Sequence, residues 1–267
     1  MMKILLPFIL VLAANYLPAQ KITGRITYEY KQRLQDVEIP RKATLVFTDS
    51  TSVFFHSRGS GIVSVNIDGD IGGPFMSYTS GPEHNGKSCI DFYKKDKEGN
   101  TVYTNVADDV MKAREIIYFR SFIYEEPGVP SMDWHLIDST KQIGGYICRA
   151  ATVEFRGRTY FAWYTPEIPV PLGPWKLQGL PGLILDVRDS DRRIVFEVST
   201  INLQLKQKAL KEITPPRSAK REISFEEYKT IHWREQLRVN RVAESSSDRG
   251  SGYSNIRRHN TLEIFDQ

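Results

Sequence analysis

GPWKLQGLPGLILDV, residues 173–187, is the stretch that decides the fold, because it joins a Gly- and Pro-rich loop directly to an apolar strand pattern. Its glycines do not precede a helix, and no Gly-Lys-Ser/Thr follows, so the pattern excludes a phosphate-binding loop. Pro181 and Gly182 predict the centre of a type II turn, in which proline presets φ and glycine supplies the positive φ that follows. We expect this stretch to be first a structural corner and only second a docking surface.

Upstream of the corner, Pro166, Pro169, Pro171 and Pro174 exclude regular ladder pairing and predict a stiff, extended crossing over the sheet. A preordered apolar loop loses little entropy on binding, so this crossing is also the candidate binding surface. Docking there requires its aromatic side chains and Leu180 to stay partly exposed. The candidate binding residues are Trp163, Tyr164, Pro171, Gly173, Pro174, Trp175, Leu180, Pro181 and Gly182.

Outward from the corner, the apolar residues recur with period two, which predicts a mainly β protein. Short strands joined by turns predict hairpins over residues 43–56, 151–165 and 183–200. The predicted fold is a curved antiparallel sheet of many short strands with a C-terminal helix, and a half-barrel around a helix is one arrangement of such a sheet. The helix is predicted to start at Ser224, which with Glu227 forms a capping box.

The chain is predicted to contain four segments. Residues 1–19 combine a lysine, a short apolar run and a small residue at the cleavage point, which is typical of a secretory signal peptide. Residues 20–206 form the antiparallel β domain, 207–244 a C-terminal helical extension, and 245–267, rich in Ser, Gly, Asn and Arg, a flexible tail. No segment left after signal removal is long and apolar enough to cross a membrane. The expected location is therefore the periplasm or the exterior.

Residue types with reactive side chains form no catalytic or metal-binding pattern. The five histidines are scattered, so no metal site is predicted, and no Gly-x-Ser-x-Gly occurs. The formal net charge of +4 is too small to indicate nucleic-acid binding. Cys89 and Cys148 could pair in an oxidising compartment, or both could be buried free thiols. No cofactor is expected.

The sequence resembles the GLPGLI family, exported proteins of Bacteroidota, through the hexapeptide at residues 179–184. The stretch STKQIGGYICRAATVEFRGRTYFAWYTPEIPVPLGP, residues 139–174, is similar to the same family's strand and turn pattern. The family has no established activity. The resemblance implies export to a Gram-negative cell envelope, and its members' frequent proximity to TonB-dependent outer-membrane receptors suggests such a receptor as partner by association.

Three functions are compatible with these observations. We expect a non-enzymatic exported binding or accessory protein of the cell envelope. The first alternative is a carrier that holds an apolar ligand in a cavity of the sheet. The second is a hydrolase of unrecognised type, which requires a cleft that brings a Ser, His or carboxylate pair within hydrogen-bond reach.

Overall fold

The structure, a computed structural model, describes residues 21–34, 37–56, 61–64, 76–79, 89–92, 99–117, 120–217, 221–234, 237 and 262–265. The signal peptide predicted at 1–19 and most of the tail predicted at 245–267 lie outside the described residues. Among the helices of the described residues, none is long and apolar enough to cross a membrane.

Strands make up most of the described chain, and their bounds are as follows. The strands are β1 (Gly24–Leu34), β2 (Val37–Phe47), β3 (Thr51–His56), β4 (Gly61–Ser64), β5 (Met76–Thr79), β6 (Cys89–Phe92), β7 (Asn100–Asn105), β8 (Val110–Ile117), β9 (Arg120–Glu125), β10 (His135–Ile143), β11 (Tyr146–Phe155), β12 (Arg158–Thr165), β13 (Leu183–Asp189), β14 (Ile194–Leu203) and β15 (Glu222–Ser224). The helices are α1 (Gln207–Leu210) and a longer one at residues 225–234.

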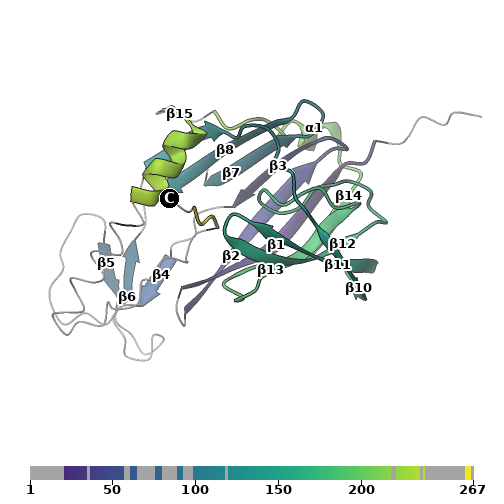
Figure 1. Ribbon diagram of the computed structural model, residues 1–267, viewed down its shortest axis with the longest axis horizontal. Coiled ribbons are helices and arrows are strands. Elements are labelled where there is room, and N and C mark those ends of the chain that lie inside the picture. The colour runs from purple at the N-terminus through teal and green to yellow at the C-terminus, as the bar shows by residue number, and fades with distance from the viewer. Residues whose placement is uncertain are drawn as a thin grey trace, which may run out of the picture.

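The main sheet has 12 strands in the order β10-β11-β12-β13-β14-β1-β2-β3-β7-β8-β9-β15, with β10 and β15 at its edges (Figure 1). Neighbouring strands run antiparallel except β15, which is parallel to β9. A second sheet contains β4, β6 and β5. The mainly antiparallel fold and the three predicted hairpins are confirmed: their strands are β2–β3, β11–β12 and β13–β14. Their turn sequences set these local pairings, whereas the pairing of β1 with β14 joins distant parts of the chain.

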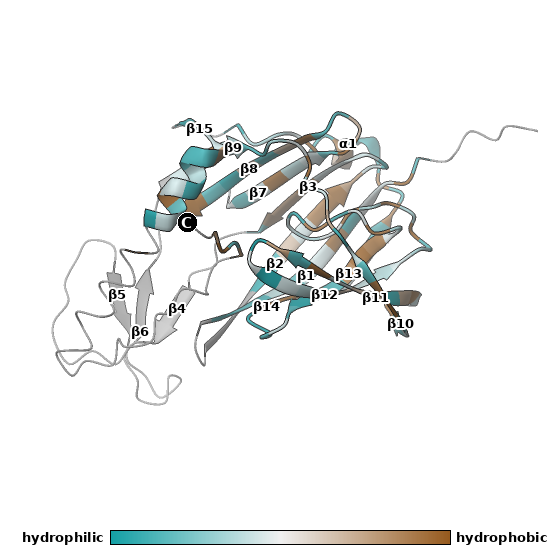
Figure 2. Ribbon diagram, in the orientation of Figure 1, coloured by the Kyte–Doolittle hydropathy of each residue, from teal (hydrophilic) through white to brown (hydrophobic). Residues whose placement is uncertain are grey.

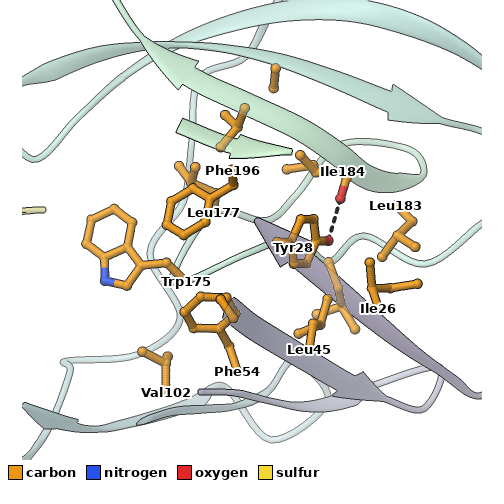
Figure 3. Close-up of a cluster of buried hydrophobic side chains, with 14 of the residues drawn as sticks. Ile26, Tyr28, Leu45, Phe54, Val102, Trp175, Leu177, Leu183, Ile184 and Phe196 are labelled. Carbon is orange, nitrogen blue, oxygen red and sulfur yellow. Dashed lines mark hydrogen bonds between the residues drawn. The ribbon is translucent and has the colours of Figure 1, made fainter. Parts of the chain in front are cut away.

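One face of the main sheet, here called the inner face, carries the core, and the opposite face is called the outer face. Apolar and polar residues alternate along its strands (Figure 2), as expected when only one face is buried. Tyr28, Phe54 and Phe196 lie on the inner face, and the rings of Phe54 and Phe196 pack edge to face at 5.9 Å. Figure 3 shows Trp175 and Leu177 of the β12–β13 connection packed into the same cluster. That connection, rather than a helix alone, therefore covers the inner face.

The C-terminal part of the chain contacts the main sheet in two places: β15 pairs with β9, and residues 262–265 bond to β12 and to the β11–β12 turn. The helix at residues 225–234 begins as predicted, because Ser224 Oγ accepts a hydrogen bond of 3.1 Å from the Glu227 N–H. β15 was not predicted within the helical extension, because three residues are too few to show an alternation of apolar and polar side chains. Residues 262–265 differ from the predicted flexible tail, since Glu263 is 1% exposed.

Candidate functional site

The connection between β12 and β13, residues 166–182, contains most of the predicted binding residues and is here called the crossing. Its apolar side chains are almost completely buried: Ile168, Val170, Leu172, Trp175, Leu177 and Leu180. Local backbone hydrogen bonds replace ladder pairing, for example from the Gly179 N–H to the Pro171 carbonyl at 2.9 Å. The connection is therefore a stiff crossing, as its prolines predict, but it lies in the core rather than on the surface.

The turn at Pro181–Gly182 requires glycine for a different reason from the one that a type II turn implies. The Gly182 N–H donates to the Leu180 carbonyl at 2.7 Å, which closes a three-residue turn, so the predicted turn type is wrong. A Cβ on Gly182 would lie 2.2 Å from the Thr165 carbonyl oxygen. Glycine is thus required because the backbones at the ends of β12 and β13 approach closely, and the register pairs Thr165 with Leu183.

The predicted binding residues fall into three levels of exposure. Tyr164, Gly173, Pro174, Trp175, Leu180 and Gly182 are buried, Trp163 and Pro171 are half-buried, and Pro181 is exposed. All lie within or beside the crossing, but the buried aromatic rings and Leu180 pack in the core and offer no free surface. Trp163 alone among the three predicted aromatic anchors reaches solvent, because it lies on the outer face of β12.

The charged centre of the crossing is Lys176, whose side chain is 0% exposed. Its ammonium group donates to Glu126 Oε1 at 2.7 Å and to the Tyr124 hydroxyl at 2.8 Å, and it contacts Glu263 Oε1. Burial alone would lower the pKa of Lys176, but the negative charges of the nearby carboxylates more than offset it and raise that pKa. Lys176 is therefore a buried cation held by carboxylates from two distant segments.

Arg156 lies in the β11–β12 turn and completes the positive side of this cluster. Its guanidinium donates to Glu126 Oε2 at 2.6 Å and lies 3.7 Å from Glu263 Oε1. It also lies over the rings of Phe225 and Phe265, at 4.7 and 5.4 Å from their centroids. Glu126 thus bridges the two cations, which fixes the turn, the crossing and the end of β9 relative to one another.

Glu115 on β8 is the third carboxylate of the cluster. It accepts a hydrogen bond from the Tyr124 hydroxyl at 3.1 Å, and its Oε2 lies 2.7 Å from the Tyr228 hydroxyl oxygen. Burial, with the negative charge of Glu263 second, raises the pKa of Glu115 to about 7. Two cations balance two carboxylates here, so Glu115 carries the charge that the cluster compensates least.

Sequence reasoning missed this cluster because its members come from β8, β9, two turns, the C-terminal helix and the last residues of the chain. One local signal was available: Lys176 is the only charged residue from Pro171 to Leu180, a stretch in which Gln178 is the one other polar side chain. A lysine is rarely placed in such a stretch unless it is paired.

The outer face carries a second feature around Trp163. Its ring packs against Phe161 at 5.5 Å, edge to face. Lys141 Nζ lies 4.8 Å from the Trp163 ring centroid and forms a 2.9 Å ion pair with Asp186. Arg188 lies 5.2 Å from the Phe161 ring centroid and has no carboxylate partner among the described residues. An aromatic pair flanked by cations therefore stands half-exposed on a polar sheet face.

Other reactive side chains have structural roles. Asp189 in the β13–β14 turn accepts hydrogen bonds from the Arg193 and Ile194 N–H groups and pairs with Arg158 at 2.7 Å. No group of three or more potential metal ligands occurs within the part of the chain that the structure describes.

Of the two states that the sequence left open, the structure shows no disulfide at Cys148, which is a buried free thiol in β11. Its predicted partner, Cys89, begins β6 in the other sheet, so the two residues are not on neighbouring strands. Burial, with the negative charge of Asp186 second, raises the pKa of the Cys148 thiol to about 11. The thiol is therefore protonated at neutral pH and behaves as a small core side chain.

Comparison with known proteins matches one segment of the chain to a family model. Residues 154–186 match the model of the Porph_ging family, described as a protein of unknown function and associated with Bacteroidota. This segment contains Arg156, Trp163 and Lys176. No protein of curated function matches the chain.

Similar solved structures show the same fold at low identity. One, described as the structure of PNGF-II in the P21 space group, has a TM-score of 0.50 and 15% identity over 82% of this chain and 34% of that chain. A second, PNGF-II in the C2 space group, has a TM-score of 0.50 and 12% identity over 80% of this chain and 33% of that chain. The chain therefore spans about a third of the length of these structures.

Proposed function

We propose that this chain is a non-enzymatic, exported binding protein of the cell envelope that docks a partner protein through its outer face at Phe161 and Trp163. The observation that carries the proposal is the half-exposed aromatic pair on a mostly polar face, within the segment that matches the family model. Aromatic side chains supply large contact area at low entropic cost, which is why they are enriched in interfaces.

The charges around the pair define the partner's chemistry. Lys141 is neutralised by Asp186, whereas Arg188 has no carboxylate partner among the described residues. A carboxylate beside an apolar or aromatic group on the partner would complement this arrangement. The GLPGLI likeness supports an accessory role, in which this fold works beside another polypeptide. A TonB-dependent receptor remains a candidate partner through that likeness alone.

Two observations favour binding over the alternatives. The crossing fills the inner face with its own side chains, which leaves the carrier hypothesis without support from the described residues. The buried carboxylates and Lys176 are bonded to one another, so they do not resemble the accessible acid and base that a hydrolase requires.

The export part of the proposal has a direct test. We expect the mature protein to start at Gln20 or Lys21 and to be recovered without detergent. N-terminal sequencing decides this point. Retention of Met1 together with recovery in the membrane pellet would contradict it.

The docking part is tested by crosslinking and mass spectrometry on envelope fractions, followed by affinity measurement with the purified partner. Trp163→Ala and Arg188→Glu should each weaken binding of one stoichiometric partner by about 10-fold or more, because hot spots of interfaces are commonly Trp and Arg. Arg149→Glu is the matched control, since Arg149 is an exposed arginine on the opposite face of β11.

The variants must keep the melting temperature of the parent protein. Equal partner binding by all four proteins would overturn the docking surface. Co-purification of a stoichiometric lipid instead of a protein would overturn the proposal in favour of the carrier.

A further inference from the structure

Residues 262–265, Leu-Glu-Ile-Phe, return to the main sheet from the end of the chain. The Tyr160 hydroxyl donates to the Leu262 carbonyl at 3.1 Å, and the Ile264 N–H donates to the Arg156 carbonyl at 3.0 Å. The segment belongs to no strand or helix. It is held by these two hydrogen bonds to its backbone and by three side chains, which is how an extended peptide is held in a binding site.

The carboxylate of Glu263 enters a built polar site. Tyr228 donates to Glu263 Oε2 at 2.7 Å, Lys176 contacts Oε1, and Arg156 Nε lies 3.7 Å from Oε1. Glu263 and Lys176 are 1% and 0% exposed. These charges lower the pKa of Glu263 although burial alone would raise it. The site therefore binds a carboxylate in its ionised form.

The side chain of Phe265 enters an aromatic site on the C-terminal helix. It meets Phe225, Tyr228 and His232 edge to face, with centroid distances of 6.0, 6.0 and 5.5 Å. Between the two sites, Ile264 lies against the β11–β12 turn, where a Cβ on Gly157 would be 2.8 Å from the Ile264 Cβ. The turn thus leaves room for this backbone only because residue 157 is glycine.

The site would persist without its occupant. Glu126 bonds Lys176 at 2.7 Å and Arg156 at 2.6 Å independently of Glu263, and Glu115 Oε2 lies 2.7 Å from the Tyr228 hydroxyl oxygen. These contacts hold both cations and the hydroxyl in place. A preorganised site of this kind binds without first reorganising its own groups.

We propose that Lys176, Arg156, Tyr228 and the aromatic residues of the C-terminal helix form a peptide-binding site for an acidic segment of the pattern Glu-x-Phe. In this structure its ligand is the chain's own residues 262–265, bound in cis. The segment is separable from its site, so the same sequence binds in trans when the cis copy is weakened. This inference is independent of docking on the outer face.

The test uses the full-length protein and a fluorescent synthetic peptide with the sequence of residues 261–267. In fluorescence anisotropy, a Phe265→Ala host should bind the peptide with a Kd at least about 10-fold lower than the wild-type host, because tethering makes the intact cis segment a strong competitor. A peptide with Gln in place of Glu263 should bind at least about 10-fold more weakly, since it loses the charged bonds.

Two glycine variants, each combined with Phe265→Ala, separate the site from general destabilisation. Gly157→Ala should abolish peptide binding, because its Cβ occupies the place of Ile264. Gly145→Ala should preserve it, because that glycine also has a positive φ in a hairpin turn but has nothing within 4 Å of its Cβ position. If Phe265→Ala does not fold, the milder Phe265→Leu host serves in its place.

The proposal is overturned if the weakened host binds the peptide no better than wild type. It is equally overturned if the Gln peptide binds as well as the Glu peptide, or if Gly157→Ala and Gly145→Ala hosts bind it alike.

Discussion

At the scale of single residues, Lys176 shows how the signature stretch serves the fold. A buried ammonium group is costly to desolvate, and the attraction of its carboxylates offsets that cost only while all partners are present. The cluster therefore gives orientation rather than a surplus of stability: it fixes where the crossing, the β11–β12 turn and the chain end meet.

Replacement of Lys176 should be among the most damaging single changes on the chain. Lys176→Met leaves Glu126 and Glu263 buried with less positive charge, and should lower the free energy of unfolding by about 3–5 kcal/mol. Lys141→Met is the control, because the Lys141 side chain is 40% exposed and its pair with Asp186 should contribute no more than about 1 kcal/mol. Urea unfolding measures both. If Lys176→Met lowered the free energy of unfolding as little as Lys141→Met, Lys176 would not hold the buried carboxylates in place.

Glu115 predicts an unusual dependence of stability on pH. Its pKa is about 7 in the folded protein and 4.5 in the reference state, so between these values the folded protein binds the proton and the unfolded chain does not. The free energy of unfolding should therefore fall as pH rises from about 4.5 to about 7. The lowered pKa of Glu263 acts in the opposite direction and at lower pH, where stability is lost on acidification.

Urea unfolding at pH values between 5 and 8, spaced about one pH unit apart, tests this prediction, because it gives the free energy of unfolding at each pH. Glu115→Gln should flatten the decline, because the amide does not titrate, and should unfold at higher urea than wild type at the upper end of the range. If stability falls with pH in Glu115→Gln as it does in wild type, the pH dependence comes from another titrating group.

At the scale of elements, the crossing between β12 and β13 is positioned by close backbone contact. Gly182→Ala should lower the free energy of unfolding by about 2–3 kcal/mol, because its Cβ would lie 2.2 Å from the Thr165 carbonyl oxygen and the two strand ends must separate. Gly145→Ala, which meets only open space, should cost about 1 kcal/mol from its positive φ. Thermal unfolding compares them. A Gly182→Ala protein as stable as Gly145→Ala would show that this corner is not tight.

The same element shows what sequence can and cannot predict. The need for glycine at position 182 follows from the local Pro-Gly pattern and is confirmed. The turn type was wrong because the close approach to Thr165 depends on strand register, which the local sequence does not encode. Likewise Leu180, at 1% exposed, is core, since the fold places the crossing on the inner face.

At the scale of the whole molecule, local turns predicted the hairpins, but not how they join. The β14–β1 pairing brings Leu203 beside Gly24, and β3 pairs with β7 across the residues of the second sheet. The Lys176 cluster has the same origin, because Glu115 and Glu263, from distant parts of the chain, both lie beside the Tyr228 hydroxyl. Distant pairing of this kind leaves no periodic signal, so most of the candidate site was beyond prediction.

The strand order predicts which parts of the molecule open first. β1 lies in the middle of the main sheet and is paired on both sides, whereas β10 is an edge strand whose residues are exposed from His135 to Gln142. Local opening costs least where few apolar contacts are lost. Amides of β1 should therefore exchange with deuterium at least about 100-fold more slowly than those of β10, as measured by hydrogen-exchange mass spectrometry. Equal protection of β1 and β10 would mean that another molecule covers β10 in solution. Hydrogen exchange of the Arg149→Glu and Trp163→Ala proteins would then show which face of the sheet that molecule contacts.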